Sequence, residues 1–277
     1  MLALQEATYR GISSLMHDAI GLSLGDSKLP LVSSRLASRI QRLGLGGFED
    51  YLELIASDDD DGEFQVAVDL LTTNETYFFR EPAHFELLEK ILLAERPRSV
   101  SVWSAASSFG DEAFSIAMLL SDMQQHGRLG DDWSVLGTDI SDRVLRSASN
   151  ATYPADRLRN VSEPRLKRYC LRGEGESEGL IQIQARLRDR VRFGQLNLCE
   201  DVGDIGMFDV VFLRNVLIYF DAATKRAVVD RVLTRLRPGG LLFLGTAEGR
   251  VACDTALHPL APGAFRKASG DPGRTAR

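Results

Sequence analysis

The chain has 277 residues, of which 44% are hydrophobic and 26% charged, a composition typical of a globular protein with one large core and a smaller accessory domain. Its 39 acidic residues outnumber its 33 basic ones and give a net charge of -6. Broad nucleic-acid and membrane surfaces favour positive charge, so we expect neither a nucleic-acid partner nor membrane insertion. No apolar run approaches the roughly 20 residues that span a bilayer, and no signal-peptide pattern is present, so we expect a cytoplasmic protein.

The three cysteines and four histidines are widely separated along the chain. Neither a disulfide framework nor a zinc site has this spacing. Metal ligands on one helix would also lie closer together in sequence. We therefore expect no metal.

Residues 1–72 have the pattern of a small all-α domain. Apolar residues recur at helical spacing, as at Val32, Leu36 and Ile40, and a run of glycines from Gly44 closes that helix. The acidic stretch 58–61 reads as a loop before another helix over residues 64–71. We expect about four helices here.

From residue 73 to 267 the expected elements alternate between strand and helix. Strands are expected at residues 100–105, 133–138, 191–196, 208–213 and 241–245, and helices at residues 110–120, 141–150 and 222–237. Such alternation predicts a parallel sheet covered by helices. The last helix should end at Pro238-Gly239-Gly240, and residues 268–277 are expected to form a disordered tail.

The alternation breaks at about residues 153–190, where a small antiparallel β insertion is expected. Apolar and polar residues alternate there with period 2, as on a strand with one buried face. The apolar set is Ile181, Ile183, Ala185 and Leu187, and the polar set is Gln182, Gln184, Arg186 and Arg188. Turns at residues 173–175 and 178–179 would delimit a short sheet whose free edge can accept a peptide strand. A purely structural insertion is the alternative.

Two expected strands end in polar residues suited to binding a ligand. In an open α/β sheet, ligands bind at the carboxyl ends of strands, beside helix N-termini. Glu112 begins a helix after the first strand, where it either complements the helix dipole or binds an ammonium group. Asp139 follows the second strand, where it either accepts hydrogen bonds from a ribose diol or caps a helix. The GxGxxG spacing of dinucleotide-binding folds is missing.

Five motifs resemble those of the CheR chemoreceptor methyltransferases, in the same order and over nearly the whole chain. They are TNETYFFRE at 73–81, WSAA at 103–106, GDE at 110–112, NL at 197–198 and FDVVFLRNVLIYF at 208–220. The resemblance implies a Rossmann-like α/β sheet that binds S-adenosylmethionine, preceded by the all-α domain and carrying the antiparallel insertion. It further implies methyl transfer to glutamate side chains of chemoreceptors.

The same resemblance implies which residues contact the cofactor. They are Asn74, Thr76, Arg80, Glu112, Asp139, Asn197, Leu198, Arg214 and Asn215. The chain departs from the family pattern at Phe109, a position that is usually small, and at Asp111 and Ala113, which replace glutamate and proline. Leu213 replaces a common cysteine. These departures leave the cofactor affinity open.

The expected reaction needs no general base, because a glutamate carboxyl with a pKa of about 4.3 is already ionised at neutral pH. What remains is orientation of the reacting groups, which we assign to the guanidinium of Arg80 and the hydroxyl of Tyr219. The alternatives are that Arg80 caps a helix and that Tyr219 packs in the core.

Two basic sets are expected to dock the cytoplasmic domains of chemoreceptors. Arg35, Arg39 and Arg42 recur at helical spacing and predict a basic stripe for the acidic methylation region, with an ordinary solvated face as the alternative. Arg186 and Arg188 belong to the insertion, with which some members of the family hold a receptor C-terminal peptide as a tether.

We expect a monomer. Two other functions stay open on the sequence: a methyltransferase acting on another protein or a small acid, and a cofactor-binding module without turnover.

Overall fold

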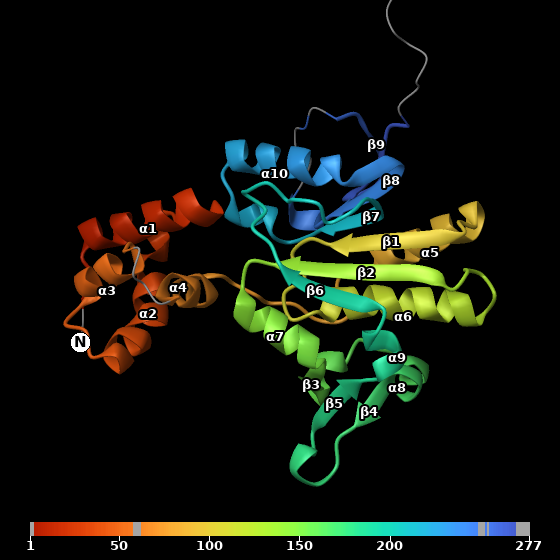
Figure 1. Ribbon diagram of the computed structural model, residues 1–277, viewed down its shortest axis with the longest axis horizontal. Helices are drawn as coiled ribbons and strands as arrows, with labels where there is room; N and C mark the ends of the chain where they lie inside the picture. Colours follow the sequence, from red (N-terminus) through yellow and green to blue (C-terminus); the bar gives the residue numbers. More distant parts are fainter. Residues whose placement is uncertain (1–2, 58–61, 249–252, 254, 270–277) are drawn as a thin grey trace, which may run out of the picture.

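The structure is a computed structural model that describes residues 3–57, 62–248, 253 and 255–269. A bundle of helices lies beside a sheet that is covered by further helices (Figure 1). The bundle contains α1 (Glu6–Ile20), α2 (Leu29–Leu43), α3 (Phe48–Ile55) and α4 (Glu63–Leu71). The expected loop at residues 58–61 and most of the expected tail lie outside the described residues.

The bundle has its own apolar core, which confirms the expected all-α part. Val32, Leu36 and Ile40 of α2 are fully buried, as their spacing predicted. Helices α1 and α2 end at Gly21 and Gly44, both with a left-handed backbone (φ 71° and 70°) that glycine adopts without strain.

The three arginines of α2 do not form the expected continuous stripe. Arg39 Nε donates to both carboxylate oxygens of Glu63 at 2.9 and 3.2 Å, and the Tyr51 hydroxyl donates to the same carboxylate at 2.8 Å. Glu63 is only 6% exposed, so Arg39 neutralises a buried charge. Arg42 is exposed.

Arg35 is also turned inward. Its guanidinium donates to the carbonyl oxygens of Leu71 and Thr72 at 2.7 and 3.1 Å and to the hydroxyl of Thr73 at 2.9 Å. Arg35 and Arg39 are half-buried, and their guanidinium groups are bound to other groups of the chain, so a docking role for this helix stays a prediction. Arg35 fixes the segment that leaves the bundle.

Seven strands form the main sheet, in the order β6-β2-β1-β7-β8-β10-β9. Its strands are β1 (Ser99–Ser104), β2 (Asp132–Asp139), β6 (Val191–Gln195), β7 (Phe208–Leu213), β8 (Leu236–Leu244), β9 (Leu257–Ala261) and β10 (Ala264–Lys267). The first five in spatial order pair in parallel, which confirms the expected parallel sheet. The antiparallel strands β9 and β10 extend its far edge and were not predicted.

Helices cover both faces of this sheet (Figure 1). They are α5 (Pro82–Glu95), α6 (Asp111–Gln125), α7 (Asp142–Asn150) and α10 (Ala222–Thr234). Val210 and Phe212 of β7 share a core cluster with α5 and α6, whereas Val211 and Leu213 share another with α10. Burial on both faces explains why this strand is a continuous apolar run in sequence.

The last helix ends earlier than its sequence pattern indicated. It stops at Thr234, and β8 begins at Leu236, so Pro238-Gly239-Gly240 lies within the strand. Gly239 has a φ of 78°, and the pairing of β7 with β8 shifts register between Phe208 and Val210. The proline and glycines therefore mark an irregular strand rather than the end of the helix.

The antiparallel insertion is confirmed as a three-stranded sheet of order β3-β5-β4. Its elements are β3 (Thr152–Pro154), a 3-10 turn (Ala155–Leu158), α8 (Glu163–Tyr169), β4 (Cys170–Arg172), a second 3-10 turn (Gly175–Ser177), β5 (Leu180–Ile183) and α9 (Ala185–Arg188). Tyr153 and Ile183 join the core cluster that contains α6, so this small sheet packs firmly against the main domain.

The expected long strand of the insertion is wrong beyond Ile183. Residues 185–188 form the short helix α9, on which Leu187 is buried as Ile183 is. A spacing of four residues fits both strand and helix periods, so the alternation did not distinguish them. Arg186 consequently donates to the carbonyl of Arg168 and lies over the Tyr169 ring, and Arg188 is half-buried.

The order of strands places a crevice at one edge of the sheet. The chain runs from β1 outward to β2 and β6, and then returns to β7 on the other side of β1. Ligands bind at such a switch point, beyond the carboxyl ends of the strands. The helical bundle lies off this edge (Figure 1) and is held there by Ser23 N–H donating to the Tyr219 carbonyl at 2.9 Å.

Replacing Arg39 with alanine should remove the guanidinium that neutralises Glu63. We expect the free energy of unfolding to fall by about 2–3 kcal/mol, because the buried carboxylate of Glu63 would lose the guanidinium of Arg39. Urea denaturation followed by circular dichroism measures this. Arg42→Ala, on the exposed side of the same helix, is the matched control and should change stability by less than about 0.5 kcal/mol. Equal losses in the two variants would contradict this account of Arg39.

Candidate active site

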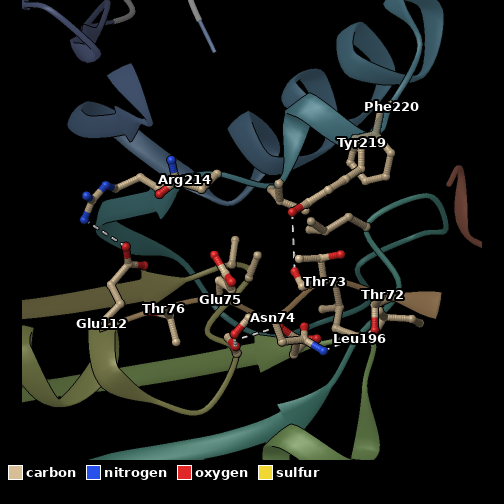
Figure 2. Close-up of a pocket in the computed structure, with 18 of the residues that line it drawn as sticks. Thr72, Thr73, Asn74, Glu75, Thr76, Glu112, Leu196, Arg214, Tyr219 and Phe220 are labelled. Carbon is tan, nitrogen blue, oxygen red and sulfur yellow. Dashed lines mark hydrogen bonds and ion pairs between the residues drawn. The ribbon is translucent and has the colours of Figure 1, made fainter. Parts of the chain in front are cut away.

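A pocket lies at the carboxyl ends of the parallel strands and borders the helical bundle. Figure 2 shows residues that line it. Its floor comes from the residues that follow β1, β2, β6 and β7, and Ile20 and Leu22 of the bundle close it from above. The space that it encloses together with its open mouth is about 990 Å³. All nine residues expected to contact a cofactor line this pocket, and so does Tyr219.

The turn between β1 and α6 brings backbone close to the pocket. Ala105 and Ala106 line it, and their small side chains let a ligand approach the main chain. Gly110 ends the turn with a φ of 86°, and a Cβ there would lie 3.0 Å from both Ala148 and Phe193. Glycine is therefore required at this position, and α6 starts at a fixed place beside the pocket.

Glu112, in the first turn of α6, belongs to the polar end of the pocket. One carboxylate oxygen accepts the Ser104 hydroxyl at 2.7 Å and the other accepts Arg214 Nη1 at 3.0 Å. Burial raises the pKa of Glu112, while Arg214 and Ser104 act in the opposite direction. Figure 2 shows the pair of Glu112 and Arg214 at one end of the pocket, away from Tyr219.

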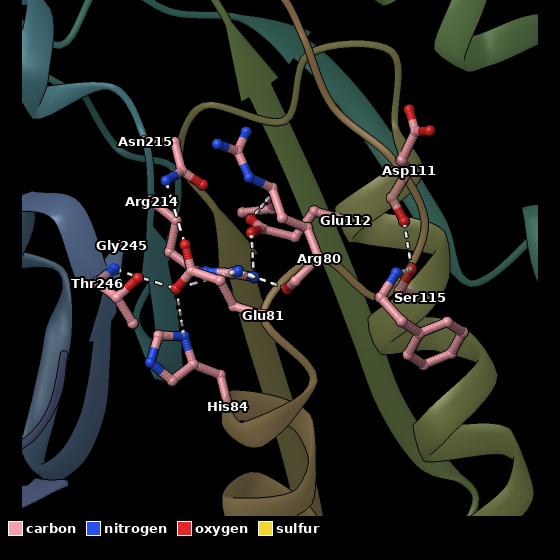
Figure 3. Close-up of polar contacts among 12 residues, drawn as sticks. Arg80, Glu81, His84, Asp111, Glu112, Ser115, Arg214, Asn215, Gly245 and Thr246 are labelled. Atoms are coloured by element: carbon pink, nitrogen blue, oxygen red, sulfur yellow. Dashed lines mark hydrogen bonds and ion pairs between the residues drawn. The ribbon is translucent and has the colours of Figure 1, made fainter. Parts of the chain in front are cut away.

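Arg214 is shared between two carboxylates (Figure 3). It also lies 3.5 Å from Glu81, and its Nη2 donates to the Arg80 carbonyl at 2.5 Å. Burial alone would raise the pKa of Glu81, but Arg214 and hydrogen bonds from Asn215 and Thr246 bring it below its usual value. Two carboxylates around one guanidinium leave this end of the pocket suited to a further cation, such as an ammonium group.

Sequence reasoning missed Glu81. Its carboxylate accepts Asn215 Nδ2 at 3.3 Å and the Thr246 N–H at 3.1 Å, so it fixes residues from two strand ends. A charged residue directly before Pro82 has the pattern of an ordinary helix start, and nothing in the sequence indicated contacts 134 and 165 residues away.

Asp139, at the end of β2, presents a carboxylate that is fixed by backbone groups. Its two oxygens accept the N–H groups of Ser108 at 2.9 Å and Ser141 at 3.0 Å. Burial raises the pKa of Asp139, and these N–H groups oppose the shift. Helix α7 is capped by Ser141, whose hydroxyl accepts the Val144 N–H at 3.4 Å. Asp139 is therefore not needed as a cap, and each oxygen keeps acceptor capacity.

Arg80 and Tyr219 approach the segment Thr72–Tyr77. Arg80 Nη1 donates to the Glu75 carbonyl at 3.0 Å, and the Tyr219 hydroxyl donates to the Thr73 carbonyl at 3.5 Å. Neither alternative from the sequence fully describes them. Arg80 binds this segment rather than the start of α5, and Tyr219 is half-buried, lining the pocket while its ring also packs against the bundle core.

The other side of the pocket is apolar. Leu196 and Leu198 after β6, Ile140 after β2 and the two bundle residues named above form this wall. Between the leucines, Asn197 Nδ2 donates to the Ala19 carbonyl at 2.7 Å, so its amide group ties the wall to α1. An apolar wall opposite carboxylates suits a planar ring linked to polar groups.

The departures at Phe109 and Asp111 do not reach this pocket, which neither residue lines. Asp111 is fully buried and accepts two hydrogen bonds from Arg157, at 2.7 and 3.0 Å. Burial raises the pKa of Asp111, and the Arg157 guanidinium lowers it. These substitutions act on the contact between α6 and the insertion.

Over the described ranges, no cluster of three His, Cys, Asp or Glu side chains is arranged to hold a metal ion. In the same part of the chain, no helix is both long and apolar enough to cross a membrane.

Comparison with known proteins gives two family matches that together span most of the chain. The all-alpha domain of CheR methyltransferases matches residues 7–72, and their SAM binding domain matches residues 74–258. The chain is 41% identical over 248 residues to the chemotaxis protein methyltransferase of Escherichia coli strain K12, covering 89% of this chain and 86% of that protein.

Two further relatives match the chain over a similar length. Chemotaxis protein methyltransferase 2 of Pseudomonas aeruginosa is 39% identical over 246 residues, covering 88% of this chain and 86% of that protein. The chemotaxis protein methyltransferase of Borreliella burgdorferi is 30% identical over 263 residues, covering 91% of each. The two domain matches and these relatives show that the chain belongs to the CheR methyltransferase family of S-adenosylmethionine-dependent enzymes.

Proposed function

We propose that this enzyme transfers a methyl group from S-adenosylmethionine to glutamate side chains of chemoreceptors in the cytoplasm, giving methyl esters and S-adenosylhomocysteine. The observation that carries the proposal is the pocket itself. The carboxylates of Glu112 and Asp139, an apolar wall and two candidate orienting groups lie together at the switch point of the sheet. The names of the relatives support a role in chemotaxis.

The residues of the pocket fit this cofactor by charge and shape. S-adenosylmethionine supplies a methyl group bound to a sulfonium. Glu112, with Glu81 behind it, would hold the ammonium of its amino-acid part, because among the described residues the one guanidinium of Arg214 serves both carboxylates. Asp139 would accept its ribose hydroxyls, and the wall of Ile140 and Leu198 would cover its adenine.

The reaction itself asks the chain for position rather than proton transfer. The acceptor carboxylate is already charged, so the residues near it need to hold it in line with the methyl group. Arg80 and Tyr219 both line the pocket, and they bind the backbone of residues 73–77 at Glu75 and Thr73. We assign both to orientation, because a strong ion pair would weaken the acceptor as a nucleophile.

Labelled cofactor tests the proposal directly. The purified enzyme should transfer label to the cytoplasmic domain of at least one chemoreceptor of the source organism. If label appears only on other proteins or on small acids, the enzyme is a methyltransferase with a different acceptor. Cofactor that binds without any transfer would indicate a binding module.

Asp139→Ala should weaken cofactor binding at least about tenfold, because ribose hydroxyls would lose a charged acceptor. Isothermal calorimetry measures the dissociation constant, and thermal unfolding checks that the variant folds. Asp139→Asn keeps one acceptor oxygen, so its dissociation constant should lie between those of Asp139→Ala and the wild type. Asp142→Ala, three residues along and outside the pocket, is the control. Unchanged affinity in Asp139→Ala would remove this residue from the cofactor site.

Tyr219→Phe should leave cofactor affinity within about twofold and lower the single-turnover methylation rate about tenfold, the loss of one hydrogen bond near the reacting groups. Single-turnover kinetics with enzyme in excess separate this rate from receptor binding. A variant that reacts at the wild-type rate would reduce Tyr219 to a packing residue.

We propose further that the insertion binds a receptor C-terminal peptide as an added strand. β5 is the central strand, so β3 and β4 are the two edges, and β3 ends in Pro154, which has no N–H for pairing; we therefore assign the peptide to the edge of β4. The Gly173 N–H donates to β5, and pairing alternates along an antiparallel strand, so the backbone groups of Arg172 point away from the sheet. Beside it, Leu171 is 52% exposed. This edge replaces Arg186 and Arg188 as the expected contact.

Arg172→Pro should abolish peptide binding, because proline removes the outward N–H without breaking a bond to β5. Arg172→Ala keeps that N–H and is the control. Fluorescence titration without cofactor measures how tightly each variant and the wild type bind peptides from every receptor C-terminus of the source organism. If the wild-type protein binds none of these peptides, the tether is excluded.

A further inference from the structure

A second groove lies on the other side of the segment that walls the pocket. Residues 72–77 and Arg80 line both. The groove runs between the bundle, which contributes Asp69 and Leu70, and the insertion, which contributes Pro154 and Asp156. Its lining comes from the bundle, residues 72–77, α7 and the insertion, so a ligand in it would contact several separate parts of the chain, as an extended segment of a macromolecule does.

The groove is basic although the whole chain is acidic. Its arginines are Arg35, Arg80, Arg143, Arg157 and Arg159, and its carboxylates are Asp69, Glu75 and Asp156. The whole chain carries a net charge of -6, whereas arginines outnumber carboxylates among the residues that line this groove. A local basic groove favours an acidic partner by electrostatic complementarity.

Two of these arginines are available to a partner. Arg143 on α7 is exposed; its guanidinium donates a 3.4 Å hydrogen bond to the Asp69 carbonyl and has no ion pair among the described residues. Arg159 is exposed, and no ion pair to it is found among the described residues. Arg35, in contrast, is bound to the segment itself, and Arg157 is bound to buried Asp111.

Phe109 lies among these arginines. The Arg157 guanidinium is 4.5 Å from the centre of its ring, and that of Arg143 is 5.7 Å away. The Phe109 carbonyl accepts the Tyr153 hydroxyl at 2.8 Å, so the residue is fixed against the insertion. The aromatic ring and the ion pair of Arg157 with Asp111 together hold guanidinium groups in place beside the groove. Two departures from the family pattern, Phe109 and Asp111, thus shape the groove.

We propose that this groove binds the acidic segment of the protein substrate that flanks the acceptor glutamate, with Arg143 and Arg159 pairing with its carboxylates. The acceptor side chain then reaches the pocket past Arg80, the arginine that borders both spaces. This inference rests on the proposed function and names the surface that selects the substrate. Phe109 and its neighbours would make that selection differ from enzymes with a small residue there.

The test is a double charge reversal, Arg143→Glu with Arg159→Glu, assayed with purified receptor cytoplasmic domains. We expect the KM for the receptor to rise at least about tenfold and its salt dependence to flatten, with kcat and cofactor affinity unchanged. Arg143→Lys with Arg159→Lys keeps the charges and should restore most of the affinity. Arg146→Glu with Arg192→Glu changes the net charge equally at exposed positions outside the groove and is the matched control.

If Arg143→Glu with Arg159→Glu has the same receptor KM as Arg146→Glu with Arg192→Glu, the groove is not the binding surface, and the proposed function is unaffected. Direct binding of the receptor domains, followed by fluorescence anisotropy, separates the opposite case. In that case the receptor domains bind the wild type, bind the groove variant more weakly, and are methylated by neither enzyme. This result would support the groove and contradict the proposed function.

Discussion

The segment Thr72–Tyr77 is the constraint on which the rest of the site depends. It has no regular secondary structure, yet side chains from three directions bind its backbone. Arg35 reaches it from the bundle, the Ser108 hydroxyl donates to the Asn74 carbonyl at 2.9 Å from the turn after β1, and Tyr219 reaches it from the turn after β7. Because irregular backbone needs such partners when it is partly buried, these contacts decide where the wall of the pocket lies.

The same wall separates two chemical environments. On its inner side, the carboxylates of Glu112 and Asp139 and an apolar surface lie at the switch point of the sheet, where α/β folds bind ligands. On its outer side, arginines from the bundle, α7 and the insertion face a broad groove. The bundle and the insertion therefore do more than extend the catalytic domain, since each contributes one side of the groove and the bundle also closes the pocket.

The sequence predicted well those elements whose signal is local. The strand at residues 208–213 was found because burial on both faces makes it wholly apolar, and the residues that follow the strands were found because parallel strands end together. The nine expected cofactor residues came from motif resemblance, and their gathering in one pocket agrees with it. The roles of individual residues stay predictions.

The errors have two physical causes, which are dependence on distant partners and a spacing that fits more than one element. Helical spacing placed Arg35 and Arg39 on one face, but the buried carboxylate of Glu63, 24 residues away from Arg39, turns one of them inward. Ile183 and Leu187 are four residues apart, a distance at which strand and helix periods agree. Glu81 was missed because its partners lie on other strand ends.

The central claim is that the pocket at the carboxyl edge of the sheet holds the methyl donor with its amino-acid end at Glu112 and its ribose at Asp139. A crystal structure of the enzyme with S-adenosylhomocysteine tests it most directly. The account predicts the ligand's amino group within hydrogen-bond distance of the Glu112 carboxylate and its ribose hydroxyls on Asp139. A ligand bound in the opposite direction, or outside this pocket, would contradict the account.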